Sequence, residues 1–151
     1  TTRLVGSEMC IRDRLVGEGG LQDMIKEKAA ALGLVDKVIF TGNQADVSDY
    51  YQAMDFFVFP SVFEGLPGTV IEAQASGLRC LVSDSVTPEV LITELAQAEP
   101  LSLGAGAWAA NVLERKEYVR NQMTQAIKAA GFDVSDQVKM LEKIYLQENC
   151  Q

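Results

Sequence analysis

The feature that most constrains the fold is a regular alternation between short apolar runs and longer amphipathic segments. The apolar runs have the length and composition of buried strands, and the segments between them have helical periodicity. Strands are expected at 37–41, 55–59 and 79–83, after a first strand that ends at Leu15-Val16. Helices are expected at 20–32, shortly after Asp46 and at 67–76. This order predicts right-handed βαβ units, and therefore an α/β chain with a Rossmann-like parallel sheet flanked by helices.

Three of the expected helices end with the same signal, a glycine followed by an apolar residue. The signal occurs at Leu32-Gly33-Leu34, Ser76-Gly77-Leu78 and Ala130-Gly131-Phe132. Glycine adopts the left-handed conformation that closes a helix, and the apolar residue after it folds back onto the last turn. These three positions are therefore the best-defined boundaries in the sequence.

The C-terminal third has a different character and is expected to form a helical tail. Leu101–Leu103 is expected to be a last short strand, followed by helices near 106–115, 117–130 and 134–148. In the final helix an apolar stripe repeats at helical spacing, at Val134, Val138, Leu141 and Tyr145. We expect the apolar stripes of these helices to pack into the core.

Composition excludes several classes of function. The net charge is −8, from 13 basic and 21 acidic residues, so nucleic-acid binding is not expected. The chain has no histidine, which excludes histidine metal sites and histidine general bases. Its three cysteines are far apart in sequence, and Cys80 lies in an apolar run, where a small core residue is expected. No apolar run is long enough to predict a transmembrane helix.

The first residues do not fit the pattern of the rest. Arg3-Leu4-Val5-Gly6 nearly repeats as Arg14-Leu15-Val16-Gly17, and residues 5–14 have neither helical nor strand periodicity. The stretch resembles a translated sequencing adapter. We therefore predict that residues 1–14 are a non-native leader and that 15–151 is one partial domain.

Ligands of open parallel sheets bind at the carboxyl ends of the strands, so the loops that follow strands are the candidate site. Gly17 and Gly19 form a strand-to-helix turn, which suits either a phosphate site or merely a tight turn. The loop 61–68 follows a buried strand and opens a helix. Its glycines expose backbone N–H groups, and Glu64 in the loop and Glu72 in the helix flank the place where an anion would bind. A nucleotide sugar, with hydroxyls on both sides of a phosphate, suits this arrangement.

Several of these motifs together resemble family 4 glycosyltransferases, in their order and spacing. The signature is Glu64-x7-Glu72 within PSVFEGLPGTVIEAQASG. It is preceded by Leu15-Val16-Gly17-Glu18-Gly19, Val38-Ile39-Phe40-Thr41-Gly42 and Met54-Asp55-Phe56-Phe57-Val58-Phe59. The resemblance covers about residues 15–90. The tail, with Trp108 in a short helix, is most similar to the branch that builds bacterial capsule and exopolysaccharide.

The resemblance implies a GT-B fold, of which this chain is most of the C-terminal, donor-binding domain. It implies that Glu64 binds donor-sugar hydroxyls and is the catalytic candidate, and that Glu72 holds the ribose hydroxyls. The remaining donor-binding residues that it implies are Gly65, Leu66, Pro67 and Gly68 around the sugar and diphosphate, Gly42, Asn43 and Gln44 near the base, and Gly17 and Gly19 in the cleft.

The resemblance further implies a retaining hexosyltransferase that takes a nucleotide-diphosphate sugar, UDP-linked, without a metal or other cofactor. The acceptor is expected to be a glycan or lipid-linked saccharide bound by an N-terminal domain. Localisation is expected to be cytoplasmic, at the inner face of the plasma membrane, with any membrane contact peripheral and not through this fragment. The family's Arg and Lys that neutralise the diphosphate come before the Gly-x-Gly turn, where this chain has no native-looking segment, and the acceptor domain is missing as well, so the fragment alone is expected to be inactive.

Two other classes remain open from the residues themselves. Glu64 and Glu72 could be the carboxylate pair of a glycoside hydrolase, although that chemistry needs a defined separation and a proton donor of raised pKa. A non-enzymic α/β nucleotide-binding module is the other alternative. Release of nucleotide only when an acceptor is present, without free sugar, distinguishes a transferase from a hydrolase.

Overall fold

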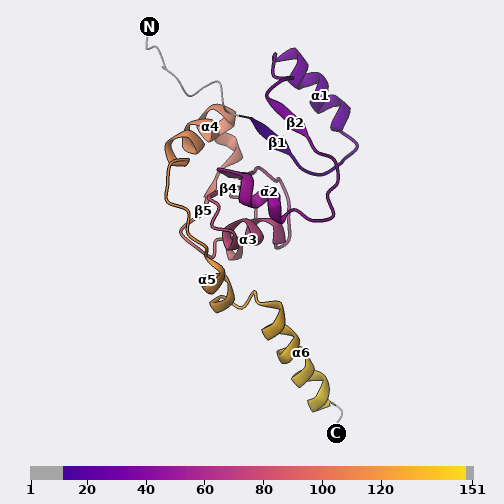
Figure 1. The fold of residues 1–151 in the computed structure, drawn as a ribbon, viewed down its shortest axis with the longest axis vertical. Coiled ribbons are helices and arrows are strands. Elements are labelled where there is room, and N and C mark those ends of the chain that lie inside the picture. The colour runs from indigo at the N-terminus through magenta and orange to yellow at the C-terminus, as the bar shows by residue number, and fades with distance from the viewer. Residues whose placement is uncertain (1–11, 149–151) are drawn as a thin grey trace. The chain divides into compact units, whose positions relative to one another are not determined.

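The computed structural model describes residues 12–148, which form two compact units that divide between Val47 and Ser48. The first unit contains strand β1 (Asp13–Leu15), helix α1 (Gln22–Ala31) and strand β2 (Val38–Phe40). The strands pair in parallel, with Leu15 opposite Phe40 (Figure 1). β1 begins at Asp13, inside the predicted leader, and most of that leader lies outside the described residues. The leader boundary therefore stays a prediction.

The second unit is built on a three-stranded parallel sheet in the order β3-β4-β5. Its elements up to the last strand are α2 (Ser48–Ala53), β3 (Phe57–Phe59), α3 (Gly68–Ala75), β4 (Cys80–Ser83) and β5 (Ala96–Glu99). A 3-10 turn at Pro88–Val90 lies between β4 and β5. The predicted α/β class with parallel strands and flanking helices is confirmed in both units.

The core of the second unit lies between β4 and α3. All four residues of β4 are buried, as are Val70, Ile71, Ala73 and Gln74 of α3. Cys80 is fully buried, as predicted, and burial raises the pKa of its thiol to about 12. The buried Gln74 amide donates to the Val90 carbonyl oxygen (2.8 Å) and accepts from the backbone N–H and hydroxyl of Thr93 (3.0 Å each). This network fixes α3 against the segment that leads into β5.

The three glycine signals are confirmed as helix ends. Gly33, Gly77 and Gly131 have φ of +68°, +76° and +90°. In each case the next residue donates its N–H to a carbonyl five positions earlier, as Leu78 does to Ala73 (3.0 Å). This is the hydrogen bond of a Schellman motif.

Two predicted elements of the C-terminal third are wrong. Leu101–Leu103 is a 3-10 turn, and the last strand is β5, none of whose four residues is a strong strand former. The predicted helix 117–130 is shorter, because only α5 (Thr124–Ala129) is helical. Residues 117–123 run without helix, since the side chains of Tyr118 and Arg120 bind the backbone of the α2 and α3 ends instead.

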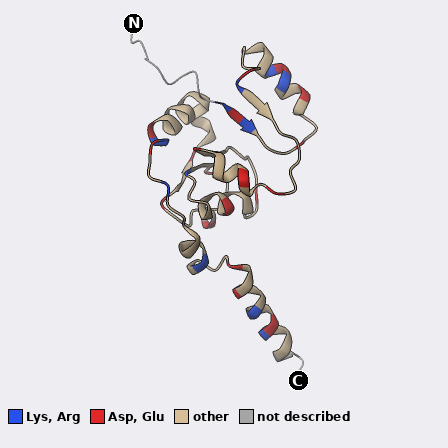
Figure 2. Ribbon diagram, in the orientation of Figure 1, with Lys and Arg blue, Asp and Glu red and all other residues tan. Residues whose placement is uncertain are grey.

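The stripes of the last helices divide into two kinds. α4 (Gly104–Arg115) buries Trp108, and α5 buries Ile127, so core packing is confirmed for these two helices. α6 (Val134–Glu148) buries no described residue, and Val134 is 77% exposed. Core packing is therefore wrong for α6, because Val138, Leu141 and Tyr145 of its stripe are also about half exposed or more. Acidic and basic residues follow one another along this helix (Figure 2).

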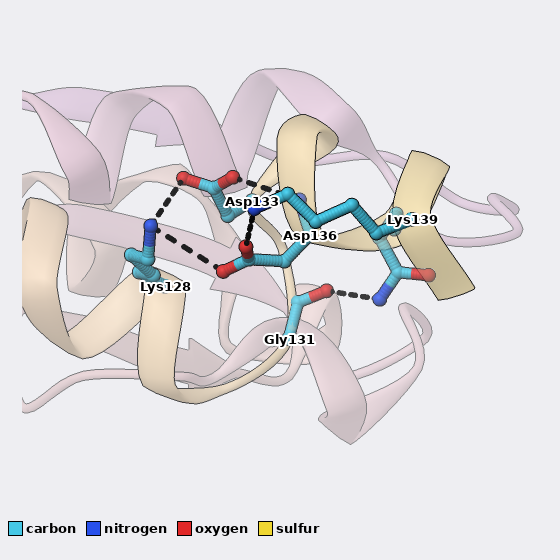
Figure 3. Close-up of polar contacts among 6 residues, drawn as sticks. Lys128, Gly131, Asp133, Asp136 and Lys139 are labelled. Atoms are coloured by element: carbon cyan, nitrogen blue, oxygen red, sulfur yellow. Dashed lines mark hydrogen bonds and ion pairs between the residues drawn. The ribbon is translucent and has the colours of Figure 1, made fainter. Parts of the chain in front are cut away.

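A polar cluster joins α5 to the start of α6 (Figure 3). Asp133 caps α6, because its carboxylate accepts the N–H of Asp136 (3.1 Å). The Lys128 ammonium lies 3.4 Å from Asp133 and 3.3 Å from Asp136, and Lys139 lies 3.2 Å from Asp136. The cluster thus ties the two helices together at their junction.

Candidate functional site

The predicted donor residues of the second unit lie where β3 ends and α3 begins. After β3 the chain passes through the loop 60–67, and α3 opens at Gly68. Pro67, which is buried, precedes the first helical residue, and no side chain of the described residues caps this end of the helix. The first N–H groups of a helix have no partner within the helix, so this end can bind an anion.

Glu64 is an exposed carboxylate held by its own loop. The Ser61 hydroxyl lies 2.9 Å from Glu64 Oε1 and 3.3 Å from the Phe63 carbonyl oxygen. The apolar side chains that precede it in the loop are exposed to solvent, Val62 to 76% and Phe63 to 88%. A carboxylate presented in this way can accept hydrogen bonds from the hydroxyls of a ligand.

Glu72 lies one turn further along α3, and its side chain is exposed. The phenol hydroxyl of Tyr51, from α2, donates to Glu72 Oε2 over 3.1 Å. Tyr51 itself is only 5% exposed. Burial, followed by the charge and the hydrogen bond of Glu72, raises the pKa of Tyr51 well above its usual range, so its hydroxyl stays protonated.

The predicted residues of the first unit lie at the carboxyl ends of β1 and β2. Gly17 donates its N–H to the Gly42 carbonyl oxygen (2.8 Å), and both glycines have positive φ. The carboxylate of Glu18 accepts the N–H of Asn43 (3.4 Å). The Gln44 amide donates to the Thr41 carbonyl oxygen (2.7 Å). Gly19 accepts the N–H of Gln22 at the start of α1 (3.0 Å).

Each unit therefore gathers its own share of the predicted residues. The first brings together Gly17, Gly42 and Asn43, and the second places Glu64 to Gly68 at the opening of the helix that carries Glu72. Sequence reasoning missed Glu18, Tyr51 and Ser61 as partners of site residues. Tyr51 left no signal, because the pair that it forms joins two helices far apart in sequence. Ser61 could have been found, since it lies three residues before Glu64 in the same loop.

An apolar cavity of about 260 Å³ lies beside the carboxyl ends of β4 and β5. Its lining includes Val82, Asp84, Val86, Val90 and Ala98. The loop after β4 is one of the strand-end loops that were predicted as the candidate site, and it forms one wall of this cavity. Glu64 and Glu72 do not line this cavity.

The described residues contain neither a cluster of metal-ligating side chains nor a membrane-spanning helix. No group of three or more metal-ligating side chains comes together within 12–148. No helix in this part of the chain has both the length and the apolar character needed to span a bilayer.

The comparisons with known proteins agree with this architecture. Residues 5–115 match the family model described as glycosyl transferases group 1. EpsF of Bacillus subtilis, named as a glycosyltransferase, is 35% identical over 139 residues, which are 87% of this chain and 35% of EpsF. The lipopolysaccharide core biosynthesis mannosyltransferase LpsB of Rhizobium meliloti is 33% identical over 81 residues, 54% of this chain and 23% of LpsB.

Solved structures show the same fold. HepE from Anabaena in complex with UDP has a TM-score of 0.69 at 20% identity, covering 91% of this chain and 41% of HepE. The lipopolysaccharide outer core galactosyltransferase WaaB in its apo form also has a TM-score of 0.69, at 22% identity, covering 90% of this chain and 40% of WaaB.

The likeness to HepE and WaaB shows that this chain has the Rossmann-like fold of GT-B enzymes. The chain belongs to the glycosyl transferases group 1 family, as its motifs predicted. It spans about a third of the length of EpsF.

Proposed function

We propose that this chain is the donor-binding part of a retaining glycosyltransferase that uses a nucleotide-diphosphate sugar, with UDP as the nucleotide. The observation that carries the proposal is the arrangement of the loop 60–67 and α3. An exposed carboxylate, Glu64, stands in the loop, an uncapped helix N-terminus follows it, and a second carboxylate, Glu72, stands one turn later. The fold shared with HepE, which was solved with UDP, supports the choice of nucleotide.

The residues divide the donor between them. Glu64 accepts hydrogen bonds from the hydroxyls of the sugar that is transferred. The backbone of Gly65, Leu66, Pro67 and Gly68 lines the sugar and the diphosphate. Glu72 accepts hydrogen bonds from the ribose hydroxyls. In the first unit, Gly42, Asn43 and Gln44 contact the base, and Gly17 and Gly19 border the donor.

The chemistry follows from this division. When the sugar–phosphate bond breaks, negative charge develops on the departing diphosphate. N–H groups at the start of α3 stabilise that charge, and stabilisation of charge that develops in the transition state is what accelerates such a step. The reaction proposed here needs no resident metal or other cofactor. The acceptor is a glycan or a lipid-linked saccharide in surface polysaccharide synthesis, held by a further domain at the inner face of the membrane.

Residue-resolved NMR of the ¹⁵N-labelled chain tests donor binding directly. Titration with UDP to millimolar concentration is expected to shift the amide signals of residues 65, 66 and 68–72, and those of 42–44, progressively as ligand is added. Glu72→Gln is expected to reduce the shifts, whereas Glu114→Gln, a change of an exposed glutamate in α4, leaves them unchanged. Shifts confined to other residues, or none, would overturn the proposal.

A further inference from the structure

We propose that Tyr51 is a positioning residue for the donor site, one that orients the Glu72 carboxylate so that its second oxygen receives ligand hydroxyls. The inference rests on the proposed function, because it concerns how Glu72 performs the role assigned to it there. Its basis is the hydrogen bond from the Tyr51 hydroxyl to Glu72 Oε2, 3.1 Å long.

The two partners differ in how firmly they are held. Tyr51 is 5% exposed, and its ring packs edge-on against Phe57 of β3, with ring centroids 5.9 Å apart. Glu72 is exposed and extends from the surface of α3. The core therefore fixes the direction of the hydroxyl, and the hydroxyl in turn restricts a carboxylate that would otherwise sample several rotamers. With Oε2 engaged, Oε1 is left to accept from a ligand.

The backbone of Tyr51 is fixed to the helix that carries Glu72. The Arg120 guanidinium donates to the carbonyl oxygens of Tyr51 and Met54, and its Nε donates to the Ser76 carbonyl oxygen over 2.9 Å. These acceptors are the ends of α2 and α3. One side chain thus holds both helices, so that the hydroxyl and the carboxylate keep a constant separation.

The Tyr51 hydroxyl does not need Glu72 as a hydrogen-bond partner. Glu72 lies at the surface, where a water molecule could accept the same hydrogen bond. The phenol also stays protonated, since burial and the neighbouring carboxylate raise its pKa. It is therefore a donor at any pH at which the protein works, which is what a fixed orienting group requires.

The experiment compares two ligands in four proteins by NMR titration of the chain. The ligands are UDP and its 2′,3′-dideoxy analogue, which lacks the hydroxyls assigned to Glu72. The proteins are wild type, Tyr51→Phe, Glu72→Gln and the double variant. Each titration is carried far enough for the shift curve to bend, because an initial slope is the product of the association constant and the limiting shift and only the curvature separates them.

In wild type we expect UDP to bind about tenfold more tightly than the analogue, the effect of a hydrogen bond to a charged group. Tyr51→Phe is expected to reduce that preference at least about threefold and to leave binding of the analogue unchanged. In the Glu72→Gln background, Tyr51→Phe should have no further effect. A purely structural role would weaken both ligands equally, in either background.

The outcomes separate this inference from the proposed function. A wild-type chain that binds UDP and the analogue equally would contradict the role of Glu72 itself. A preference that Glu72→Gln abolishes but Tyr51→Phe preserves would overturn the role of Tyr51 alone. Should Tyr51→Phe lose the dispersed amide spectrum of a folded chain, Arg120→Lys supplies the second variant, because it loosens the backbone of Tyr51 while the hydroxyl remains. Arg120→Lys is then expected to reduce the preference for UDP, and an unchanged preference would overturn the inference.

Discussion

A Cβ atom placed on Gly77 would lie 2.2 Å from the carbonyl oxygen of Asn121. Gly77 ends α3 with φ of +76°, and the chain after α4 returns across this point. The close approach lets Tyr118 donate to the Gly77 carbonyl oxygen (3.0 Å) and Arg120 to that of Ser76 (2.9 Å). Segment 117–123 therefore packs directly on the end of the helix that carries Glu72.

Gly77→Ala is expected to destabilise the chain more than a left-handed conformation alone explains. The conformation costs about 1–2 kcal/mol for a residue with a Cβ, and the collision with backbone adds about 1–3 kcal/mol. Gly131→Ala is the matched control, since Gly131 also ends a helix with positive φ, but its nearest neighbour would be 3.7 Å away. Denaturant unfolding of both variants measures the difference, and equal losses would contradict the close packing.

Arg120→Ala is expected to lower the free energy of unfolding by about 2–4 kcal/mol, because charge-assisted hydrogen bonds to several carbonyls are lost together. Arg120→Lys should recover only part of this, since an ammonium cannot reach the ends of two helices as a planar guanidinium does. The free energy of unfolding in urea checks both variants. A lysine variant as stable as wild type would show that the bridging geometry is unimportant.

The ion pairs of Asp136 at the junction of α5 and α6 should be lost in acid. Hydrogen bonds from Lys139 and Lys128 lower the pKa of Asp136 below its ordinary value. A carboxylate with a lowered pKa adds stability above its unfolded-state pKa of about 3.9, and that stability is lost as the pH falls through the folded value. A ¹³C NMR titration of the Asp136 carboxylate should give this low pKa, and Lys128→Met should raise it. An unchanged midpoint in that variant would contradict the ion pair.

The chain by itself is expected not to transfer sugar. It spans about a third of the length of EpsF, and catalysis in the proposed function needs an acceptor held by another domain. Incubation with UDP-glucose or UDP-galactose should release no UDP above the rate of the ligand alone. Measurable turnover by the purified chain would show that the residues described here suffice for the chemistry.

Local signals in the sequence predicted more of this fold than long-range ones did. The glycine after each helix reports a backbone conformation that few other residues adopt, so Gly33, Gly77 and Gly131 fixed three boundaries correctly. The short apolar run Leu101–Leu103 misled, because three residues after a proline have no periodicity to distinguish a strand from a turn.

The site shows the same division. The spacing of Glu64 and Glu72 is local and visible in the sequence, as is the glycine loop between them. The hydroxyl that donates a hydrogen bond to Glu72 belongs to Tyr51, and the position of Tyr51 in its helix suggests only a packing role. Arg120 was predicted to lie in a helix, because periodicity cannot reveal that its side chain binds the ends of two others.

The central claim is that Glu64 and Glu72 bind the two ends of one donor. It is tested most directly by the affinities of the chain for UDP and for one sugar nucleotide, measured by NMR titration. The sugar nucleotide is UDP-glucose or UDP-galactose, whichever the wild-type chain binds more tightly. Glu64→Gln should weaken binding of the sugar nucleotide about tenfold and leave binding of UDP unchanged. Glu72→Gln should weaken binding of both ligands about tenfold. If Glu64→Gln binds both ligands as wild type does, the loop carboxylate does not contact the sugar and the account of this site is wrong.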